Sequence, residues 1–109
     1  MKRIIISLIV LLTTASGYAQ SAVSLRDSLN AAEKELELRP DSINLRLKKA
    51  RWNVELGEWD YAKNEYDLIL LHDPDNLSAL YFRAFVNTKL GRYGFARQDY
   101  MNVLRQVPN

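Results

Sequence analysis

The amino-acid sequence predicts an all-α fold, a helical-repeat solenoid in which helix pairs stack into an α–α superhelix. Pro40, Pro74 and Pro108 are spaced by 34 residues, and further identities follow at the same spacing. Within each repeated segment the apolar residues recur every three or four positions, which is the period of an amphipathic helix. A fixed period of this length is typical of a solenoid, because each unit buries its apolar face only against its neighbours. The identical pairs are Ala50 and Ala84, Asn53 and Asn87, Leu56 and Leu90, Gly57 and Gly91, Ala62 and Ala96, Tyr66 and Tyr100, and Leu70 and Leu104.

Residues 1–19 follow the order of a secretory signal peptide. Two basic residues form a short positive region, an apolar stretch runs from Ile4 to Leu12, and small residues lead up to Ala19. A membrane anchor is the alternative, but a spanning helix needs about 20 apolar residues and this stretch has nine positions. We therefore expect export with cleavage after Ala19, and no membrane span after cleavage.

The charge balance excludes a protein that holds nucleic acid through bulk positive charge. The full chain has 15 Lys and Arg against 13 Asp and Glu, and loss of residues 1–19 removes two basic residues and no acid, which leaves 13 against 13. The sequence has no cysteine, which excludes thiolate metal sites, thiol catalysis and a lipid-anchored cysteine. An exported chain without cysteine must be held together by packing alone.

Residues 20–41 are expected to form an N-terminal capping helix. An apolar stripe runs along residues 23–39, and Pro40 ends the helix. A paired first helix would have to occupy about residues 9–22, which the signal peptide largely takes. The solenoid therefore opens with an unpaired helix. Its apolar stripe consists of Leu25, Leu29, Ala32 and Leu36.

Residues 42–109 are expected to form two helix–turn–helix units, at residues 43–76 and 77–109. Ser42 and Asn76 stand where the first helix of each unit begins, and their side chains suit an N-cap. The Leu-Gly pair that both units share ends each first helix, because glycine adopts the left-handed conformation there without steric cost. The second helices are expected from about Asp60 to His72 and from about Phe95 to Gln106.

Both units share one order of residues: a small residue in the first helix, Leu-Gly at its end, an aromatic, Ala, Tyr and a terminal Pro. These are Ala50, Leu56, Gly57, Trp59, Ala62, Tyr66 and Pro74 in the first unit, and Ala84, Leu90, Gly91, Tyr93, Ala96, Tyr100 and Pro108 in the second. This pattern resembles the tetratricopeptide repeat, here in a bacterial exported protein, and it covers residues 43–109. The sequence departs from that family at Arg46, Lys49 and Arg83, since large apolar residues are usual early in the first helix.

No pattern in the sequence indicates an enzyme, a cofactor site or a metal site. His72 is the single histidine, and the helix dipole explains its position beside Asp73 at a helix end. Glu33, Glu35 and Glu37 lie along a solvated helix face and form no acid–base pair. The sequence has no Gly-rich phosphate loop, no His–Glu metal spacing and no nucleophile elbow. We therefore expect no catalytic residue and no cofactor.

Aromatic residues at equivalent repeat positions are expected to pack in the core. The helix of residues 77–90 is apolar nearly all round, so a further repeat or a partner is expected to cover it. The equivalent aromatic pairs are Tyr66 and Tyr100, Trp59 and Tyr93, and Tyr61 and Phe95.

The resemblance implies a concave groove, lined by the first helices, that holds peptides or partner helices. Leu47, Tyr81 and Phe85 would form its apolar floor, and Arg51 and Lys89 would supply charge. The lysine–asparagine clamp with which some relatives hold a C-terminal carboxylate is not reproduced. An ordinary solvated surface explains these residues equally well, so both interpretations stay open. The full set of candidate groove residues is Asn44, Leu47, Arg51, Val54, Glu55, Ser78, Tyr81, Phe85, Thr88 and Lys89.

The sequence thus predicts an exported, non-enzymatic scaffold for a protein or peptide partner, in the periplasmic space of a Gram-negative bacterium or secreted. The alternative is an N-terminal recruiting or accessory segment of a longer multi-repeat protein or enzyme. Residues 20–75 have 8 basic and 12 acidic side chains, net −4, whereas residues 76–109 have 5 and 1, net +4. Too few helices remain to cover the apolar residues of the last one. We therefore expect either a longer natural chain, with repeats continuing beyond residue 109, or self-association through the C-terminal end.

Overall fold

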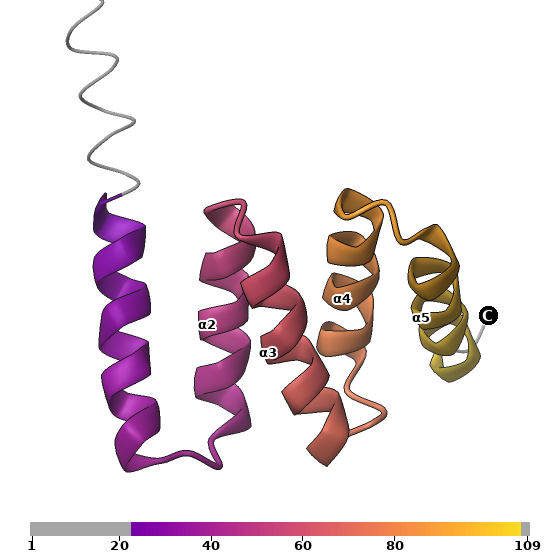
Figure 1. Ribbon diagram of the computed structural model, residues 1–109. Coiled ribbons are helices and arrows are strands. Elements are labelled where there is room, and N and C mark those ends of the chain that lie inside the picture. Colours follow the sequence, from indigo (N-terminus) through magenta and orange to yellow (C-terminus); the bar gives the residue numbers. More distant parts are fainter. Residues whose placement is uncertain (1–22, 108–109) are drawn as a thin grey trace, which may run out of the picture.

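The computed structural model describes residues 23–107, and over this range the chain is helical with no strand (Figure 1). The all-α prediction is confirmed for these residues. The signal peptide and the cleavage position after Ala19 lie outside the described residues. The N-terminal helix spans residues 23–38, and it is followed by α2 (Ile43–Glu55), α3 (Trp59–His72), α4 (Leu77–Lys89) and α5 (Tyr93–Gln106).

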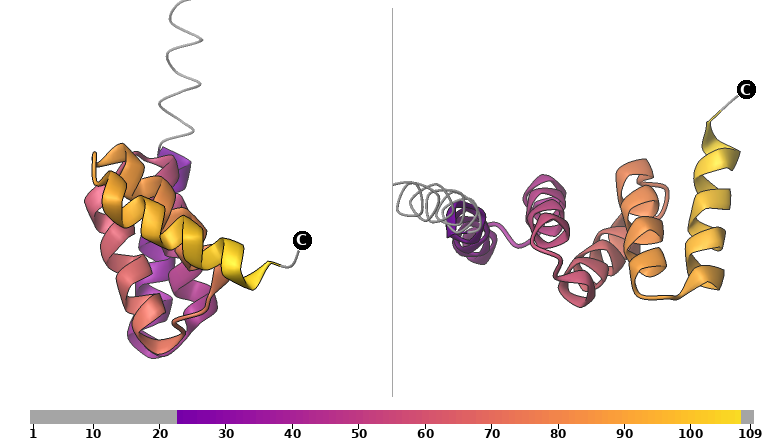
Figure 2. Two further views of the ribbon diagram at one scale, coloured as in Figure 1. Left: turned by 90° about the vertical axis from the view of Figure 1, so that its right-hand side faces the viewer. Right: turned by 90° about the horizontal axis from the view of Figure 1, so that it is seen from above.

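The helices lie side by side in chain order, and each runs in the direction opposite to the one before it (Figure 1). Figure 2 shows the same row from above, with the N-terminal helix at one end and α5 at the other. From α2 to α5 each helix contacts the next, and the two first helices, α2 and α4, also contact each other. This is the stacked arrangement of a helical-repeat solenoid.

The expected caps and turns define the start and end of the first helices. The Ser42 Oγ accepts a hydrogen bond of 3.3 Å from the Leu45 backbone N–H, and the Asn76 Oδ1 accepts one of 2.9 Å from that of Ala79. Both glycines that follow the first helices have positive φ angles of 72° and 74°, a conformation that costs other residues steric strain. The Ser and Asn caps and the Leu-Gly turns are therefore confirmed.

The core lies between the paired helices and is built on the repeated small and aromatic positions. Ala62, Tyr66 and Ile69 are fully buried in α3. The prediction that equivalent aromatics all pack in the core is wrong for Tyr61, Tyr93 and Phe95, which are exposed. Tyr61 immediately precedes Ala62, so it points about 100° around the helix from the buried stripe. The same geometry exposes Phe95. The buried apolar residues are Leu29, Ala32, Leu36, Ala50, Ala62, Tyr66, Ile69, Leu70, Ala79, Leu80, Ala84, Val86 and Ala96.

The cations that depart from the tetratricopeptide pattern are held by carboxylates of the second helices. In the first unit the Lys49 Nζ lies 2.7 Å from a Glu65 carboxylate oxygen and 3.8 Å from one of Glu33 on the N-terminal helix. The Arg46 guanidinium donates to Glu65 over 3.2 Å and to the Pro40 backbone carbonyl over 3.1 Å. The first helix thus packs through charge-assisted hydrogen bonds where the family usually packs through apolar side chains.

The second unit repeats this device at the same spacing. Arg83 donates two hydrogen bonds to Asp99, of 2.7 and 2.8 Å, and one of 3.1 Å to Asp67. Each central cation, Lys49 or Arg83, therefore pairs with one acid 16 residues before it and another 16 residues after it. Because these acids belong to the second helices on either side, the cation bridges neighbouring helix pairs.

The outer face of α5 exposes several apolar side chains. Met101, Leu104 and Val107 are all exposed, whereas Leu70, the equivalent of Leu104 in α3, is buried. The difference arises because α4 packs on α3, while no helix among the described residues covers the corresponding side of α5. An uncovered α5 agrees with the expectation from the sequence.

Candidate functional site

The candidate groove residues divide between the two first helices, which contact each other. We call the surface that they form the α2–α4 face. Leu47 and Phe85 are half-buried and pack against the core, and Arg51 is also half-buried, whereas Tyr81 and Lys89 are exposed. Asn44, Leu47, Arg51, Val54 and Glu55 lie on α2, and Ser78, Tyr81, Phe85, Thr88 and Lys89 lie on α4.

The middle of the α2–α4 face is a cation held over an aromatic ring. The Arg51 guanidinium carbon lies 4.0 Å from the centre of the Phe82 ring. Phe82 stacks in turn on the buried Tyr66, with ring centres 6.2 Å apart, and meets the edge of Tyr81 at 5.2 Å. Such a contact contributes about 0.5–1 kcal/mol at an exposed site and more when desolvated, so it holds the Arg51 charge in one place.

A second cation lies at the end of this face nearest the turns after the first helices. The Lys89 Nζ is 5.4 Å from the centre of the Phe85 ring and 6.0 Å from that of Trp59. The two rings meet edge to face at 6.1 Å. The α2–α4 face therefore has two separate cation–π contacts, Arg51 over Phe82 and Lys89 over Phe85 and Trp59.

The remaining candidate residues are less closely joined to this arrangement. Tyr81 leans toward α5, where its ring lies 5.9 Å from that of Tyr100. Asn44 and Glu55 are exposed, and within residues 23–107 their side chains make no hydrogen bond or ion pair. The structure thus places Arg51 on Phe82 and Lys89 on Phe85, and it leaves Asn44 and Glu55 outside both contacts.

Two solved structures have this arrangement of helices. A tetratricopeptide repeat protein from Parabacteroides merdae superposes with a TM-score of 0.72 and 29% identity, over 75% of this chain and 32% of its own. The second tetratricopeptide repeat of Spaghetti (RPAP3), bound to the HSP90 peptide SRMEEVD, superposes with a TM-score of 0.61 and 24% identity, over 82% of this chain and 89% of its own. The chain is a tetratricopeptide-repeat protein.

The sequence alone gives a weaker comparison. No protein-family model matches it, and no curated protein matches it either. The chain spans about a third of the length of the Parabacteroides protein, so that protein contains substantial structure beyond the shared repeats. The fold nevertheless confirms the resemblance to the tetratricopeptide repeat that the 34-residue period indicated.

Two residues that contact the cations of the α2–α4 face were absent from the expected groove of this tetratricopeptide-repeat protein. Phe82 supplies the ring under Arg51, and Trp59, the first residue of α3, supplies a ring under Lys89. Assigning the groove to first-helix positions excluded Trp59. The apolar character of the whole 77–90 helix was the signal that could have found Phe82.

Burial changes the chemistry of the layer directly beneath the face. Burial raises the pKa of Tyr66 to about 12, against a smaller opposing effect of the Arg51 charge. The Tyr66 hydroxyl has no hydrogen-bond partner within the described part of the chain. The pKa of Arg83 is also raised, chiefly by its hydrogen bond to Asp99. These perturbations belong to packing and to ion pairs.

Within residues 23–107, no group of three or more His, Asp or Glu side chains could hold a metal ion. His72 is exposed at the end of α3. None of the described helices is both long enough and apolar enough to cross a membrane. The α2–α4 face is the candidate binding site among the described residues.

Proposed function

We propose that this protein is an exported, non-enzymatic scaffold that binds a protein or peptide partner across the α2–α4 face. The observation that carries the proposal is the pair of cations, Arg51 and Lys89, held over aromatic rings on a surface that a partner can reach. Aromatic and arginine side chains contribute most of the binding energy in many protein interfaces. Because these side chains are already positioned before binding, they lose less conformational entropy when a partner binds.

The fold supports this function class. Tetratricopeptide repeats form a non-enzymatic scaffold fold, and one structural neighbour of this chain holds a peptide. In the present chain the positive charges of the half-buried Arg51 and the exposed Lys89 favour a partner segment with carboxylates, since these accept charge-assisted hydrogen bonds from Arg and Lys. The aromatic rings beneath these cations favour apolar side chains between those carboxylates.

The proposed export rests on the leader sequence of residues 1–19. The destination is the periplasmic space or the medium. N-terminal sequencing of the protein recovered from the exported fraction is expected to begin at Gln20. Recovery of a chain that retains Met1 would overturn the proposal of export while leaving the binding face untouched.

A charge-reversal pair tests the binding face. Lys89→Glu is expected to lower the recovery of partner proteins from the exported fraction at least tenfold. Arg105→Glu on α5 makes the same change of charge away from the face and is expected to leave recovery unchanged. Both side chains are exposed, so both variants are expected to melt within a few degrees of the wild type. Equal recovery with Lys89→Glu and wild type would contradict the proposal.

The second candidate function is that of a recruiting or accessory segment in a longer multi-repeat protein or enzyme. Its specific support is the exposed apolar surface of α5, together with the small share of the Parabacteroides protein that this chain spans. Self-association through α5 would cover the same surface. The open reading frame downstream of Asn109 distinguishes a longer chain from self-association.

A further inference from the structure

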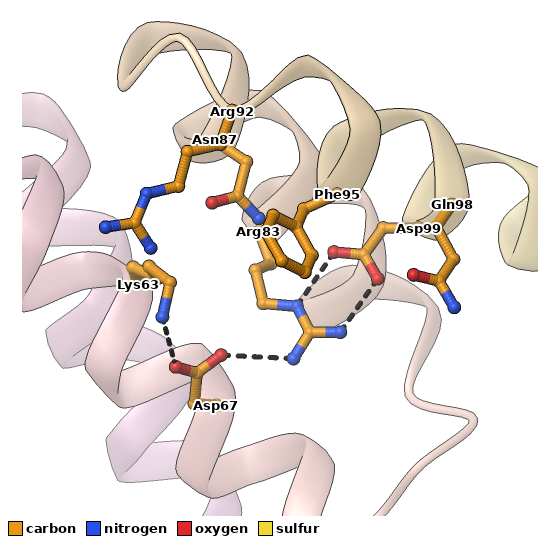
Figure 3. Close-up of a pocket in the computed structure, with 8 residues that line it drawn as sticks. All are labelled: Lys63, Asp67, Arg83, Asn87, Arg92, Phe95, Gln98 and Asp99. Atoms are coloured by element: carbon orange, nitrogen blue, oxygen red, sulfur yellow. Dashed lines mark hydrogen bonds and ion pairs between the residues drawn. The ribbon is translucent and has the colours of Figure 1, made fainter.

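A pocket opens on the opposite side of α4 from the α2–α4 face. It has a volume of about 330 Å³ and lies between α3, α4 and α5 (Figure 3). Arg83 and Asn87 reach it from α4, whereas Phe85 and Lys89 on the same helix belong to the α2–α4 face. Small-molecule sites in proteins begin at about this volume. The pocket is therefore separate from the proposed partner site.

The charges around the pocket do not cancel. Asp67 pairs with Lys63 over 2.7 Å and with Arg83 over 3.1 Å, and Asp99 holds Arg83 from the other side. Two acids thus compensate two of the cations. The side chain of Arg92 makes no hydrogen bond or ion pair within residues 23–107, and Figure 3 shows its guanidinium on the same side of the pocket as the Lys63 amine. The lining therefore has one positive charge in excess.

The remaining walls combine an adaptable amide with an aromatic ring. Asn87 is only 2% exposed, and its Oδ1 has no hydrogen-bond partner, which is uncommon for a buried polar atom. Rotation about the terminal torsion of Asn87 can turn either the amide oxygen or the amide nitrogen toward a ligand. Figure 3 shows this amide between Arg92 and the ring of Phe95. The Phe95 side chain is exposed and offers an apolar surface.

The first unit provides a comparison within the same chain. Thirty-four residues earlier, Leu29 stands at the position of Lys63 and Glu58 at that of Arg92. Glu58 is neutralised by Arg26 at 2.5 Å. Asn53, the equivalent of Asn87, also has an unpartnered Oδ1, so the amide does not distinguish the units. The excess positive charge does distinguish the two units, because only the second unit has it.

We propose that this pocket binds a small monocarboxylate with a flat apolar body. The carboxylate lies between the guanidinium of Arg92 and the amine of Lys63, and the apolar body packs on the ring of Phe95. Guanidinium groups bind carboxylates through two parallel hydrogen bonds. A monoanion matches the single excess charge, whereas a phosphate dianion would exceed it and be repelled by Asp67 and Asp99.

Benzoate is the first probe, because it combines a carboxylate with a flat ring, and benzamide is its neutral counterpart. Titration of the full protein, followed by amide chemical shifts in NMR spectra, is expected to give a Kd on the order of 1 mM for benzoate. The shifts should centre on Lys63, Arg92 and Phe95. Benzamide and inorganic phosphate are both expected to bind at least tenfold more weakly.

Matched variants assign the binding to this pocket. Arg92→Gln is expected to weaken benzoate binding at least tenfold, whereas Arg97→Gln, at an exposed arginine on α5 outside the pocket lining, should leave it unchanged. Lys89→Glu should also leave it unchanged, which separates this proposal from the partner-binding proposal. Equal binding of benzoate and benzamide, or unaltered benzoate binding by Arg92→Gln, would overturn the monocarboxylate site.

A free carboxylate and the C-terminal carboxylate of a peptide present the same chemistry to Arg92. An N-acetylated Ala-Ala-Ala-Phe peptide and its C-terminal amide distinguish these two sources. Binding of benzoate together with the acid form of the peptide indicates that the pocket accepts chain termini. Binding of benzoate without the peptide indicates a free small molecule. Failure of both acids to bind would overturn the proposal.

Discussion

Leu70 and Leu104 occupy the same position of the two repeats, and the structure predicts opposite consequences for their truncation to alanine. Leu70 is 8% exposed, under the helix pair that follows it, whereas Leu104 on α5 is 71% exposed. Identical chemistry at equivalent helix positions removes differences in helix propensity from the comparison. The two substitutions therefore measure how much the neighbouring helix contributes at one position.

The exposures set the expected magnitudes. Leu-to-Ala changes in cores cost about 2–5 kcal/mol. Because Leu70 lies at the edge of the core, we expect about 2–3 kcal/mol of lost unfolding free energy for Leu70→Ala. Leu104 buries about a third as much of its surface as Leu70, and its removal leaves no cavity. We therefore expect a cost below about 0.8 kcal/mol for Leu104→Ala.

Thermal denaturation followed by circular dichroism tests this difference. At about 4–8 °C per kcal/mol for a domain of this size, Leu70→Ala should lower the Tm by about 10–20 °C and Leu104→Ala by less than about 6 °C. Equal losses for both variants at every protein concentration would refute the assignment of α5 as an uncovered helix. A loss for Leu104→Ala that grows with protein concentration would instead indicate that copies associate through α5.

Three further predictions follow from the packing. Ala62→Leu and Ala96→Leu should each destabilise the protein by about 1–3 kcal/mol through overpacking, and unchanged thermal melts would mean that the helix pairs are misplaced. Asp99→Asn should cost about 1–2 kcal/mol in urea denaturation, because it weakens the partner of the partly buried Arg83; a neutral effect would show that the pair is solvated. Folding raises the pKa of Tyr66 to about 12, so its contribution is complete below the ordinary pKa of about 10 and falls by roughly 2 kcal/mol as the pH rises to 12. Tyr66→Phe should remove this part of the alkaline sensitivity, and urea curves at pH 8 and 11 that fall equally for both proteins would contradict it.

The sequence was sufficient for the repeat architecture because the signals are local and occur twice. A cap such as Ser42 or Asn76 acts within three residues of itself, and a glycine ends its own helix. The 34-residue period then fixes which helices are equivalent. Helix ends agree with expectation to within one or two residues, and α3 begins at Trp59 where Asp60 was expected.

The interactions between helices could not be derived in the same way. The sequence offers many acidic residues as possible partners for a charged residue on one helix. The angle at which the helices pack selects Glu65 for Lys49 and Asp99 for Arg83. The exposure of Tyr61 was also misjudged, because repetition of a residue type was taken to imply burial. Repetition shows that two positions are equivalent, and it leaves open which way both of them face.

The sequence predicted the cations of the candidate site but missed two of the aromatic rings beneath them. Arg51 and Lys89 were expected on the binding face as charges, but the rings beneath them come from Phe82 and from Trp59 on the following helix. Contacts between neighbouring helices depend on side-chain direction, which sequence spacing alone does not give.

The two proposed sites lie on opposite faces of α4. Toward α2 the helix presents Phe82 and Phe85 under cations, and toward α3 and α5 it presents Arg83 and Asn87. The polar side is stable only because Arg83 is held by acids from both neighbouring second helices, since an unpaired charge there would be costly. The same ion pairs line the pocket together with Asn87 and the ring of Phe95. The pocket thus lies where the bridging cation Arg83 replaces apolar packing between repeats, and Arg92, which has Glu58 as its equivalent in the first unit, gives it the excess positive charge.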